Sequence, residues 1–506
     1  MRSNKPRALL VVPMWPAPSG NGVAMRAHLL LSALARDHRV DVWCVPVAGV
    51  QSGGRRPEAN AARSSIAELE TDPGWILASR AGAPALRELG RPSACRFVTH
   101  RAVADLHRDF GPSGYRCTLV YRSYLLPFVE AASKDRGALG LRIVDLDDDE
   151  ATTRRRLAEL ETDPASAARH RLEAELFERF EAEHLPWADH LLAAQDSHAR
   201  RLRRRLPDLG IDVLPNAVHV PRSSSAQESR AQHRRPRGAG ESRGDNRPKS
   251  SSEAGAGPAP SYEAGAGPAP SSEVGAGPAP SSEVGAGLAP ARVGEMGFRP
   301  PKSGASDEGR ATSKATSDLH LLFVGTLSYL PNRAAAKELA EEILPLLRRG
   351  SLEVRLRLIG RRPPPDIALL ARLQGVELVT DALDLEPHYA WAHQVVLPLR
   401  AGGGTRIKIL EAFAAGVPVV ATAMAADGLR VQDGEELLIA ESAEALAEAS
   451  LRLLRSPDLA GSMARRAFRW VRRHHDRGQV ADRLADRIAE LCGSNLLRSN
   501  LPSQEL

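Results

Sequence analysis

A run of residues in the C-terminal third of the chain combines anion-binding groups with one carboxylate. It reads LPLRAGGGTRIKILEAFAAGVPVVAT over 397–422, and its polar groups are Gly402, Gly403, Gly404, Thr405, Arg406, Lys408 and Glu411. The apolar residues before the glycines predict a strand, and those after Thr405 predict a helix. Free N–H groups at the start of a helix bind anions, and glycines let an anion approach the backbone closely. Cations are disfavoured in a first helical turn, so Arg406 and Lys408 indicate an anion opposite them.

Glu411 lies three residues after Lys408, on the same side of the predicted helix and away from Ile407 and Leu410. A carboxylate there can accept two hydrogen bonds from a ribose diol. A solvated ion pair between Lys408 and Glu411 on an exposed helix face is the alternative that periodicity alone favours. The run has neither the spacing of a P-loop nor that of a G-x-G-x-x-G loop, which excludes two familiar phosphate-binding loops.

The elements around this run alternate between short apolar segments and longer helical patterns. Strands are expected over 319–325, 353–360, 394–399 and 417–422, and helices over 332–349, 365–374 and 405–416. Such alternation is typical of a parallel sheet with right-handed crossovers.

The first 221 residues begin in the same way. They predict strands over 7–15, 39–47, 141–150, 190–195 and 212–218, a helix over 22–37, and a long helix that carries Leu172, Leu176 and Phe180. The expected fold class is therefore α/β, with two doubly wound domains that face a cleft. Ligands of such sheets bind beyond the carboxyl ends of the strands.

Between these two blocks the composition changes to Ser, Arg, Gly and Pro, and four tandem decapeptides fill 251–290. Each decapeptide has too few large apolar residues to stack as a solenoid, so the segment is expected to be a disordered linker. The predicted domains are 1–221 and 318–492, with the linker over 222–317 and a tail over 493–506. Deletion of 225–315 is expected to leave a protein that folds.

The length, charge and cysteine content of the chain indicate which partners and which cellular compartment to expect. The chain has 506 residues, a net charge of +6 and a pI near 9.3, which suits binding to phosphates, anionic lipid or nucleic acid. Four widely spaced cysteines signal neither a zinc site nor a disulfide framework, and a reducing cytoplasm is the expected compartment. The N-terminal apolar stretch is only about eight residues long, too short to span a bilayer.

Several segments together resemble a known family. They are LPLRAGGGTRIKILEAFAAGVPVVATAMAADGL (397–429), LLFVGTLSYLPNRAAA (321–336), VPMWPAPSGNGVAMRAHLLLSAL (12–34), IVDLDDDEA (143–151) and LPNAV (214–218). They are similar to the motifs of the retaining glycosyltransferases of family 4, which have the GT-B fold of two Rossmann-like domains, and in particular to a GGGTR-type subgroup. The resemblance covers nearly everything outside 222–317.

The resemblance implies a donor site for a nucleoside-diphosphate sugar and assigns roles by position. Gly325 and Thr326 would approach the donor phosphates, with Asn332 in the same segment. Residues 402–405 would cradle the sugar and the diphosphate, Glu411 would hold the ribose, and Arg406 and Lys408 would neutralise the diphosphate. Gly20 and Gly22 would border the cleft from the acceptor side.

The resemblance also implies how the reaction proceeds. It indicates hexosyltransferase-like sugar transfer with retention, without a metal or a cofactor. Asp147 and Asp148 are the catalytic candidates, and capping of the following helix is the alternative for both. The acceptor is expected to be a glycan, a lipid-linked sugar or a polysaccharide precursor. The basic segment 197–210 suggests peripheral contact with the inner face of the cytoplasmic membrane, and no nucleic acid is expected as a partner.

Two departures from the family pattern keep a second reading open. Gly403 stands where many relatives have the first Glu of an E-x7-E motif, and no His stands near Asp147. A catalytically inactive protein that binds sugar nucleotides, or a partner of another transferase, is the alternative function. An epimerase or a phosphorylase on the same fold is disfavoured, the latter because no pyridoxal-binding lysine motif is found.

Overall fold

The structure is a computed structural model that describes residues 5–47, 61–111, 114–132, 136–221, 319–349, 353–403 and 406–499. The predicted linker over 222–317 lies outside these residues, as do Gly404 and Thr405.

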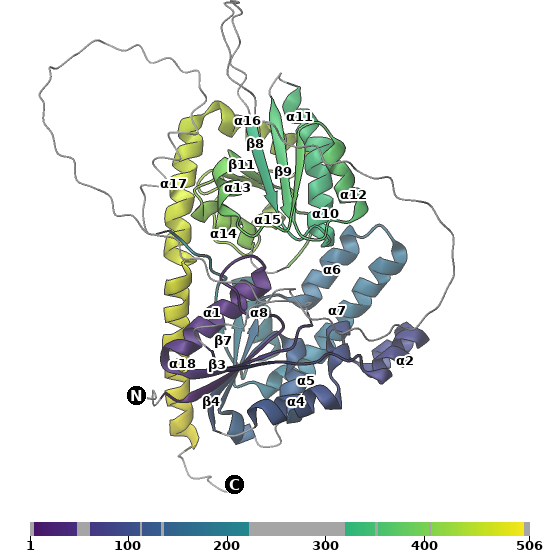
Figure 1. The fold of residues 1–506 in the computed structure, drawn as a ribbon, viewed down its shortest axis with the longest axis vertical. Coiled ribbons are helices and arrows are strands. Elements are labelled where there is room, and N and C mark those ends of the chain that lie inside the picture. The colour runs from purple at the N-terminus through teal and green to yellow at the C-terminus, as the bar shows by residue number, and fades with distance from the viewer. Residues whose placement is uncertain are drawn as a thin grey trace, which may run out of the picture. The chain divides into compact units, whose positions relative to one another are not determined.

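The first sheet in the described residues has seven parallel strands in the order β3-β2-β1-β4-β5-β6-β7. Figure 1 shows this sheet in the purple to teal part of the ribbon. Their bounds are β1 Arg7–Val12, β2 Arg39–Cys44, β3 Ala61–Ile66, β4 Tyr115–Tyr121, β5 Leu141–Leu146, β6 His190–Ala193 and β7 Gly210–Val213. Strand β1 is buried along most of its length, as its unbroken apolar run predicts for a central parallel strand. The order runs outward from β1 in both directions, which is the doubly wound topology.

The second sheet has six parallel strands in the described residues, in the order β10-β9-β8-β11-β12-β13. Their bounds are β8 Leu319–Val324, β9 Val354–Gly360, β10 Val376–Thr380, β11 Gln394–Leu397, β12 Val419–Ala421 and β13 Leu438–Ile439. The expected α/β class with two doubly wound parallel sheets is therefore confirmed.

Helices connect these parallel strands. The helices of the first block are α1 Gly22–Asp37, α2 Pro73–Ala81, α3 Ala83–Leu89, α4 His100–Phe110, α5 Leu126–Ala132, α6 Glu150–Leu160, α7 Pro164–His184 and α8 Asp196–Arg205. Those of the second block are α10 Leu330–Lys337, α11 Leu344–Arg348, α12 Pro365–Leu369, α13 Glu386–Trp391, α14 Ile407–Ala414, α15 Ala423–Ala426, α16 Ala443–Arg455, α17 Pro457–His474 and α18 Arg477–Ser499.

The helix predicted over 332–349 forms, but with a change of winding in its middle. A π-helical stretch over Glu338–Ile343 separates α10 from α11. Pro345 lies in the first turn of α11 and has no N–H to donate to the preceding turn. A local change of winding lets the helix continue past the missing hydrogen bond.

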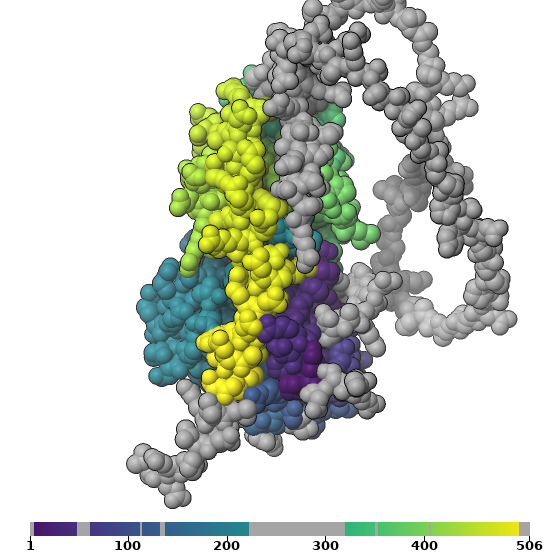
Figure 2. Space-filling view, turned by 90° about the vertical axis from the view of Figure 1, so that its left-hand side faces the viewer, coloured from purple at the N-terminus to yellow at the C-terminus, as the bar shows by residue number. Residues whose placement is uncertain are grey.

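The last helix crosses from the second block to the first. Val480, Leu484 and Ile488 of α18 are buried in the same apolar cluster as residues of α1 and of the first sheet. Figure 2 shows this helix in yellow against the purple N-terminal segment. By packing, α18 therefore completes the core of the first domain, although it follows the second domain in sequence.

The two segments that connect the domains run side by side. Val218 forms an isolated parallel bridge with Asp476, and the Nδ1 atom of His475 is 2.6 Å from the carbonyl oxygen of Asn216. The side chain of Asn216 in turn accepts a hydrogen bond from Arg26, at 3.1 Å. The segment LPNAV (214–218) thus lies at the junction between the two domains.

Candidate functional site

A cleft of about 550 Å³ lies beyond the carboxyl ends of strands of the second sheet. The first block contributes Gly20, Asn21 and Val218 to its wall. The second block contributes Gly325, Thr326, Arg361, Tyr389, Glu411 and Arg477. This is the place where doubly wound sheets bind their ligands. Four residues predicted from the sequence, Gly20, Gly325, Thr326 and Glu411, therefore meet in one cleft.

Glu411 is held by a tyrosine rather than by the lysine one turn before it. The hydroxyl of Tyr389, on α13, donates to Oε2 of Glu411 at 3.1 Å. Burial raises the pKa of Glu411 to about 7, while the Tyr389 hydrogen bond and the charges of Lys408 and Arg477 act in the opposite direction. A solvated Lys408–Glu411 pair is therefore not what the fold forms. Glu411 is a half-buried carboxyl group whose free lone pairs can meet a diol.

Lys408 points toward the segment after β8. Its Nζ donates to Oδ1 of Asn332 at 2.6 Å and lies 4.9 Å from the centroid of the Phe323 ring. Asn332 in turn donates to the carbonyl oxygen of Thr326 at 3.0 Å, and a Cβ at Gly325 would lie 2.8 Å from its amide nitrogen. Burial, with the nearby Arg406, lowers the pKa of Lys408 to about 7. Lys408, Asn332 and Gly325 thus form one packed unit that reaches the cleft wall at Gly325.

Two cations in the cleft wall were not predicted from the sequence. Arg361 follows β9 directly, and Arg477 is the first residue of α18. Among the described residues neither guanidinium has an ion-pair partner within 4.0 Å, and Nε of Arg477 is buried without a hydrogen bond. Burial lowers the pKa of Arg477, with Asp476 and Glu411 acting against this. Unpaired guanidinium groups in a cleft suit an anionic ligand.

The position of one of these cations could have been predicted from the sequence. Arg361 is the residue directly after a predicted strand, at the edge where ligands bind. Arg477 had none, because its position depends on where the final helix begins.

Arg406 supports the glycine loop instead of lining this cleft. Its Nη1 donates to the carbonyl oxygen of Gly403 at 2.7 Å, and its Nη2 donates to those of Gly402 and Met424 at 3.0 and 3.1 Å. Arg156 of α6 donates to the Gly402 carbonyl at 3.1 Å as well. Gly402 has φ +120°, a backbone conformation that favours glycine. The loop is thus fixed through its carbonyl groups.

Gly403 has no room for a side chain. A Cβ at this position would lie 1.7 Å from Oγ1 of Thr153 and 2.0 Å from Oδ1 of Asp148. Thr153 donates to this same oxygen of Asp148 at 2.8 Å. The carboxylate of Asp148 therefore occupies the space beside Gly403. Since it contacts the glycine loop, the structure brings one catalytic candidate to the predicted donor segment.

The aspartates that follow β5 have different partners and different roles. Asp149 caps α6 by accepting from the amide of Thr152 at 2.9 Å, so the capping alternative for Asp147 and Asp148 is wrong. Asp147 accepts from the hydroxyl of Tyr121 at 2.8 Å and pairs with Arg122 at 2.6 Å. Asp147 is thus held in a buried network.

Asp145 lies deeper and serves the fold. It forms an ion pair with Arg26 at 2.6 Å, and both side chains are fully buried. Burial raises the pKa of Asp145, while the charge and hydrogen bonds of Arg26 act against this. Asp145 and Asp147 therefore both have their carboxylates engaged by arginines.

The N-terminus of α1 meets the N-terminus of α14 at the cleft. Asn21 caps α1, Gly20 has φ +97°, and a Cβ at Gly22 would lie 3.0 Å from Cδ1 of Ile407. Ile407 is the first residue of α14. Two helix starts, each with a partial positive charge, thus converge where Gly20 and Gly22 were predicted.

The basic helix α8 uses part of its charge within the molecule. Arg201 pairs with Asp149, Arg203 donates to the carbonyl oxygen of Ile211 at 2.7 Å, and Arg205 donates to that of Glu178 at 3.0 Å. Arg200 and Arg204 are exposed. Among the helices that the structure describes, none has the length and apolar character needed to span a membrane.

Comparison with known proteins identifies the fold of two parallel sheets. Residues 318–456 match the model of a family described as Glycosyl transferases group 1. The fold is that of the GT-B glycosyltransferases. No curated protein sequence matches the chain.

Solved structures are similar over nearly the whole chain. The sucrose-phosphate synthase of Thermosynechococcus elongatus has a TM-score of 0.58 at 14% identity and covers 97% of this chain and 100% of its own. WaaG, a glycosyltransferase involved in lipopolysaccharide biosynthesis, has a TM-score of 0.53 at 15% identity, with 95% and 99% covered. HepE of Anabaena in complex with UDP-glucose has a TM-score of 0.52 at 11% identity, with 96% and 100% covered. At these identities the likeness supports the GT-B fold.

Proposed function

We propose that this protein transfers a sugar from a nucleoside-diphosphate sugar to an acceptor. The observation that carries the proposal is the pairing, in one cleft, of the Glu411 carboxyl group with the guanidinium groups of Arg361 and Arg477. A diphosphate needs cations, and a ribose needs a hydrogen-bond acceptor. The family match over 318–456 and the UDP-glucose bound to HepE support the same ligand class.

The charged side chains of the site take separate roles in this proposal. Glu411 accepts the ribose hydroxyls and is oriented by Tyr389. Arg361 and Arg477 take the diphosphate. Lys408 and Arg406 act as positioning residues, Lys408 through Asn332 and Arg406 through the glycine loop.

The proposed reaction exchanges one bond at the anomeric carbon for another. The bond from the sugar to the diphosphate breaks as the bond to the acceptor oxygen forms on the same face, with retention. The acceptor proton passes to the oxygen of the departing phosphate. Arg361, Arg477 and the converging helix starts stabilise the charge that develops on the diphosphate, so a metal ion is not required. Asp148, beside the glycine loop, is the side chain proposed to face the donor sugar.

We further propose a glycan or lipid-linked acceptor, as in polysaccharide biosynthesis, reached at the inner face of the cytoplasmic membrane. Exposed Arg200 and Arg204 on α8 support contact with anionic lipid. Flotation with vesicles that contain anionic lipid at low salt checks this contact, and protein that stays unbound there removes it.

The donor assay uses the purified full chain with UDP, GDP, ADP and CDP, followed by their sugars. One nucleotide should raise the melting temperature, and its sugar donors should release that nucleotide when acceptor is added. Glu411→Ala should lower kcat/KM about 100-fold, because a buried ribose contact is lost. Lys408→Ala should lower it by a similar factor through Asn332.

Glu448→Ala is the matched control, because Glu448 is an exposed carboxylate on α16. Near-normal turnover in both the Glu411 and the Lys408 variants, with the fold intact, would contradict the donor site. A thermal shift without product from any donor would instead favour the alternative function, a protein that binds sugar nucleotides without catalysis.

A further inference from the structure

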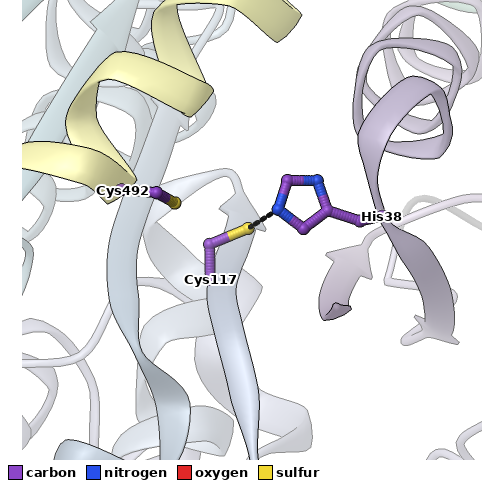
Figure 3. Close-up of side chains that lie close together, drawn as sticks. All are labelled: His38, Cys117 and Cys492. Atoms are coloured by element: carbon purple, nitrogen blue, oxygen red, sulfur yellow. Dashed lines mark hydrogen bonds between the residues drawn. The ribbon is translucent and has the colours of Figure 1, made fainter. Parts of the chain in front are cut away.

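Three side chains from distant parts of the sequence converge in the core of the first domain. His38 follows α1, Cys117 lies in β4 and Cys492 lies in α18 (Figure 3). Nε2 or Nδ1 of the histidine and the two Sγ atoms all lie within 4.8 Å of one another. His38, Cys117 and Cys492 are 7%, 0% and 5% exposed. We name these three residues the Cys–His cluster.

The imidazole of His38 faces sulfur. Its Nε2 lies 3.9 Å from Sγ of Cys117, and its Nδ1 has no hydrogen-bond partner among the described residues. A buried imidazole normally satisfies both ring nitrogens. Here the ring is turned toward the two thiols instead, as Figure 3 shows.

The donor types and the spacing match one class of ligand. Thiolate and imidazole groups are the preferred ligands of Zn²⁺, with bond lengths of about 2.3 Å and 2.0–2.1 Å. Those lengths place neighbouring ligand atoms roughly 3.6–3.8 Å apart around the ion. The 3.9 Å between Cys117 and His38 is already close to this separation.

We propose that the Cys–His cluster binds one thiophilic divalent cation, with Zn²⁺ as the fitting ion. On binding, the two thiols release their protons, and two thiolates with a neutral imidazole balance the double positive charge in the buried site. The three residues leave one position of a tetrahedral ion for a small ligand such as water. This site was not predicted from the sequence, because residues 38, 117 and 492 lie far apart and include no C-x-x-C pair.

The place of the cluster indicates a structural role. None of its residues lines the cleft. Cys492 lies near the end of α18, whose first residue, Arg477, belongs to the cleft wall. The ion would therefore anchor the far end of the helix that carries a cleft residue at its start. Since the unfolded chain would not hold the three ligands together, binding should stabilise the folded state.

The test uses the full chain, reduced and freed of metal by a chelator, and titrated with Co²⁺ and then Zn²⁺. The expected result is one equivalent of Co²⁺ with a thiolate-to-cobalt charge-transfer band that Zn²⁺ abolishes. Zn²⁺ should also raise the melting temperature, and a chelator should reverse the rise. Neither measurement needs a variant, so both stay informative if substitutions in the core fail to fold.

Substitutions then assign the ligands. Cys117→Ser and Cys492→Ser should each lose the charge-transfer band, and His38→Gln should weaken Co²⁺ binding at least tenfold. Cys44→Ser is the matched control, because Cys44 is a buried cysteine in the same apolar cluster as Cys117 and Cys492. This variant should bind Co²⁺ as the unmodified protein does.

Two outcomes would overturn the proposal. One is a reduced protein that shows neither a thiolate-to-cobalt band nor a Zn²⁺-dependent thermal shift. The other is a pair of serine variants that bind Co²⁺ as strongly as the Cys44→Ser control. An intact mass that shows loss of two thiol hydrogens before reduction, in a protein that binds no metal after reduction, would point to a Cys117–Cys492 disulfide instead.

Discussion

Lys408 and Glu411 are opposite charges that are both costly to keep ionised where they lie. Burial moves the pKa of each toward neutrality, to about 7, from ordinary values of 10.5 and 4.5. Between pH 4.5 and 7 the folded state therefore holds more protons at Glu411 than the unfolded chain does. Across this range the contribution of Glu411 to the free energy of unfolding falls as the pH rises. Between pH 7 and 10.5 the unfolded chain holds more protons at Lys408, so the contribution of Lys408 rises with pH.

The raised pKa of Glu411 predicts the effect of removing its charge. Glu411→Gln keeps the shape and removes the contribution of this carboxyl group to the pH profile. At pH 8 the free energy of unfolding should increase on the order of 1–3 kcal/mol, while at pH 4 it should change little. Melting temperatures of both proteins from pH 4 to 9 check this.

Glu448→Gln serves as the control for the pH profile, because its carboxylate is exposed. A Glu411→Gln variant that is less stable than the unmodified protein at pH 8 would show that the ionised carboxylate stabilises the fold. If stability rises while donor turnover falls, Glu411 is a residue kept for function at a cost in stability.

For single residues, the sequence predicted which side chains belong to the site better than it predicted which groups they contact. Glu411, Gly325 and Thr326 were placed in the cleft because a strand end and a helix start fix them locally. Arg406 was expected to face the diphosphate, but its guanidinium contacts backbone carbonyls of its own loop. Side-chain direction in a loop depends on tertiary contacts that spacing does not encode.

At the scale of elements, the connection from β11 to α14 depends on Gly403. The loop passes so close to Asp148 and Thr153 of the first domain that a side chain at Gly403 would overlap them. The carboxylate of Asp148 thus occupies the space that a side chain at position 403 would need. Glycine at this position therefore lets the loop pass beside α6.

The substitution Gly403→Ala should push the glycine loop away from the start of α6. A Cβ at 1.7 Å from Oγ1 of Thr153 must displace either the loop or the start of α6. We expect a loss of about 1–3 kcal/mol in the free energy of unfolding, as for other overpacked sites, together with lower kcat/KM. Thermal unfolding and the donor assay measure the two effects.

Gly493→Ala is the matched control, since no atom lies within 4 Å of its added Cβ in α18. A helical glycine of this kind should tolerate alanine with a gain of up to about 1 kcal/mol. If both variants show the same stability and the same kcat/KM, the loop can move aside at Gly403 without a loss of stability.

The elements that the sequence predicted are those with long apolar runs. Strands β1, β8 and β9 and helix α1 form close to the predicted bounds. Strand β13 has two residues, Leu438 and Ile439, and is too short to stand out from a loop. The crossing of α18 was not predicted either, because a helix pattern states which face is apolar but not which core covers it.

At the scale of the whole molecule, the predicted linker separates two halves that share one packed unit. Val218, before the linker, and Leu319, after it, belong to the same apolar cluster. Loop length changes the entropy of closure only slowly.

Deletion of 225–315 should therefore leave a soluble protein whose melting temperature and donor turnover stay close to those of the full chain. Circular dichroism, thermal unfolding and the donor assay on both proteins check this. Loss of soluble protein on deletion would refute the interpretation of 222–317 as a linker without a structural role.

The course of α18 also has a consequence for synthesis on the ribosome. Domains near the N-terminus usually fold first, while the rest of the chain is still being made. Here Val480, Leu484 and Ile488 fill the same cluster as Leu30, Leu34 and Val42. A nascent chain that has reached only residue 221 has α1 on this face of its sheet but lacks α18, which completes the cluster. Final assembly of the first domain must therefore wait for the last helix to emerge, and until then the part of the face that α18 covers is open to chaperones.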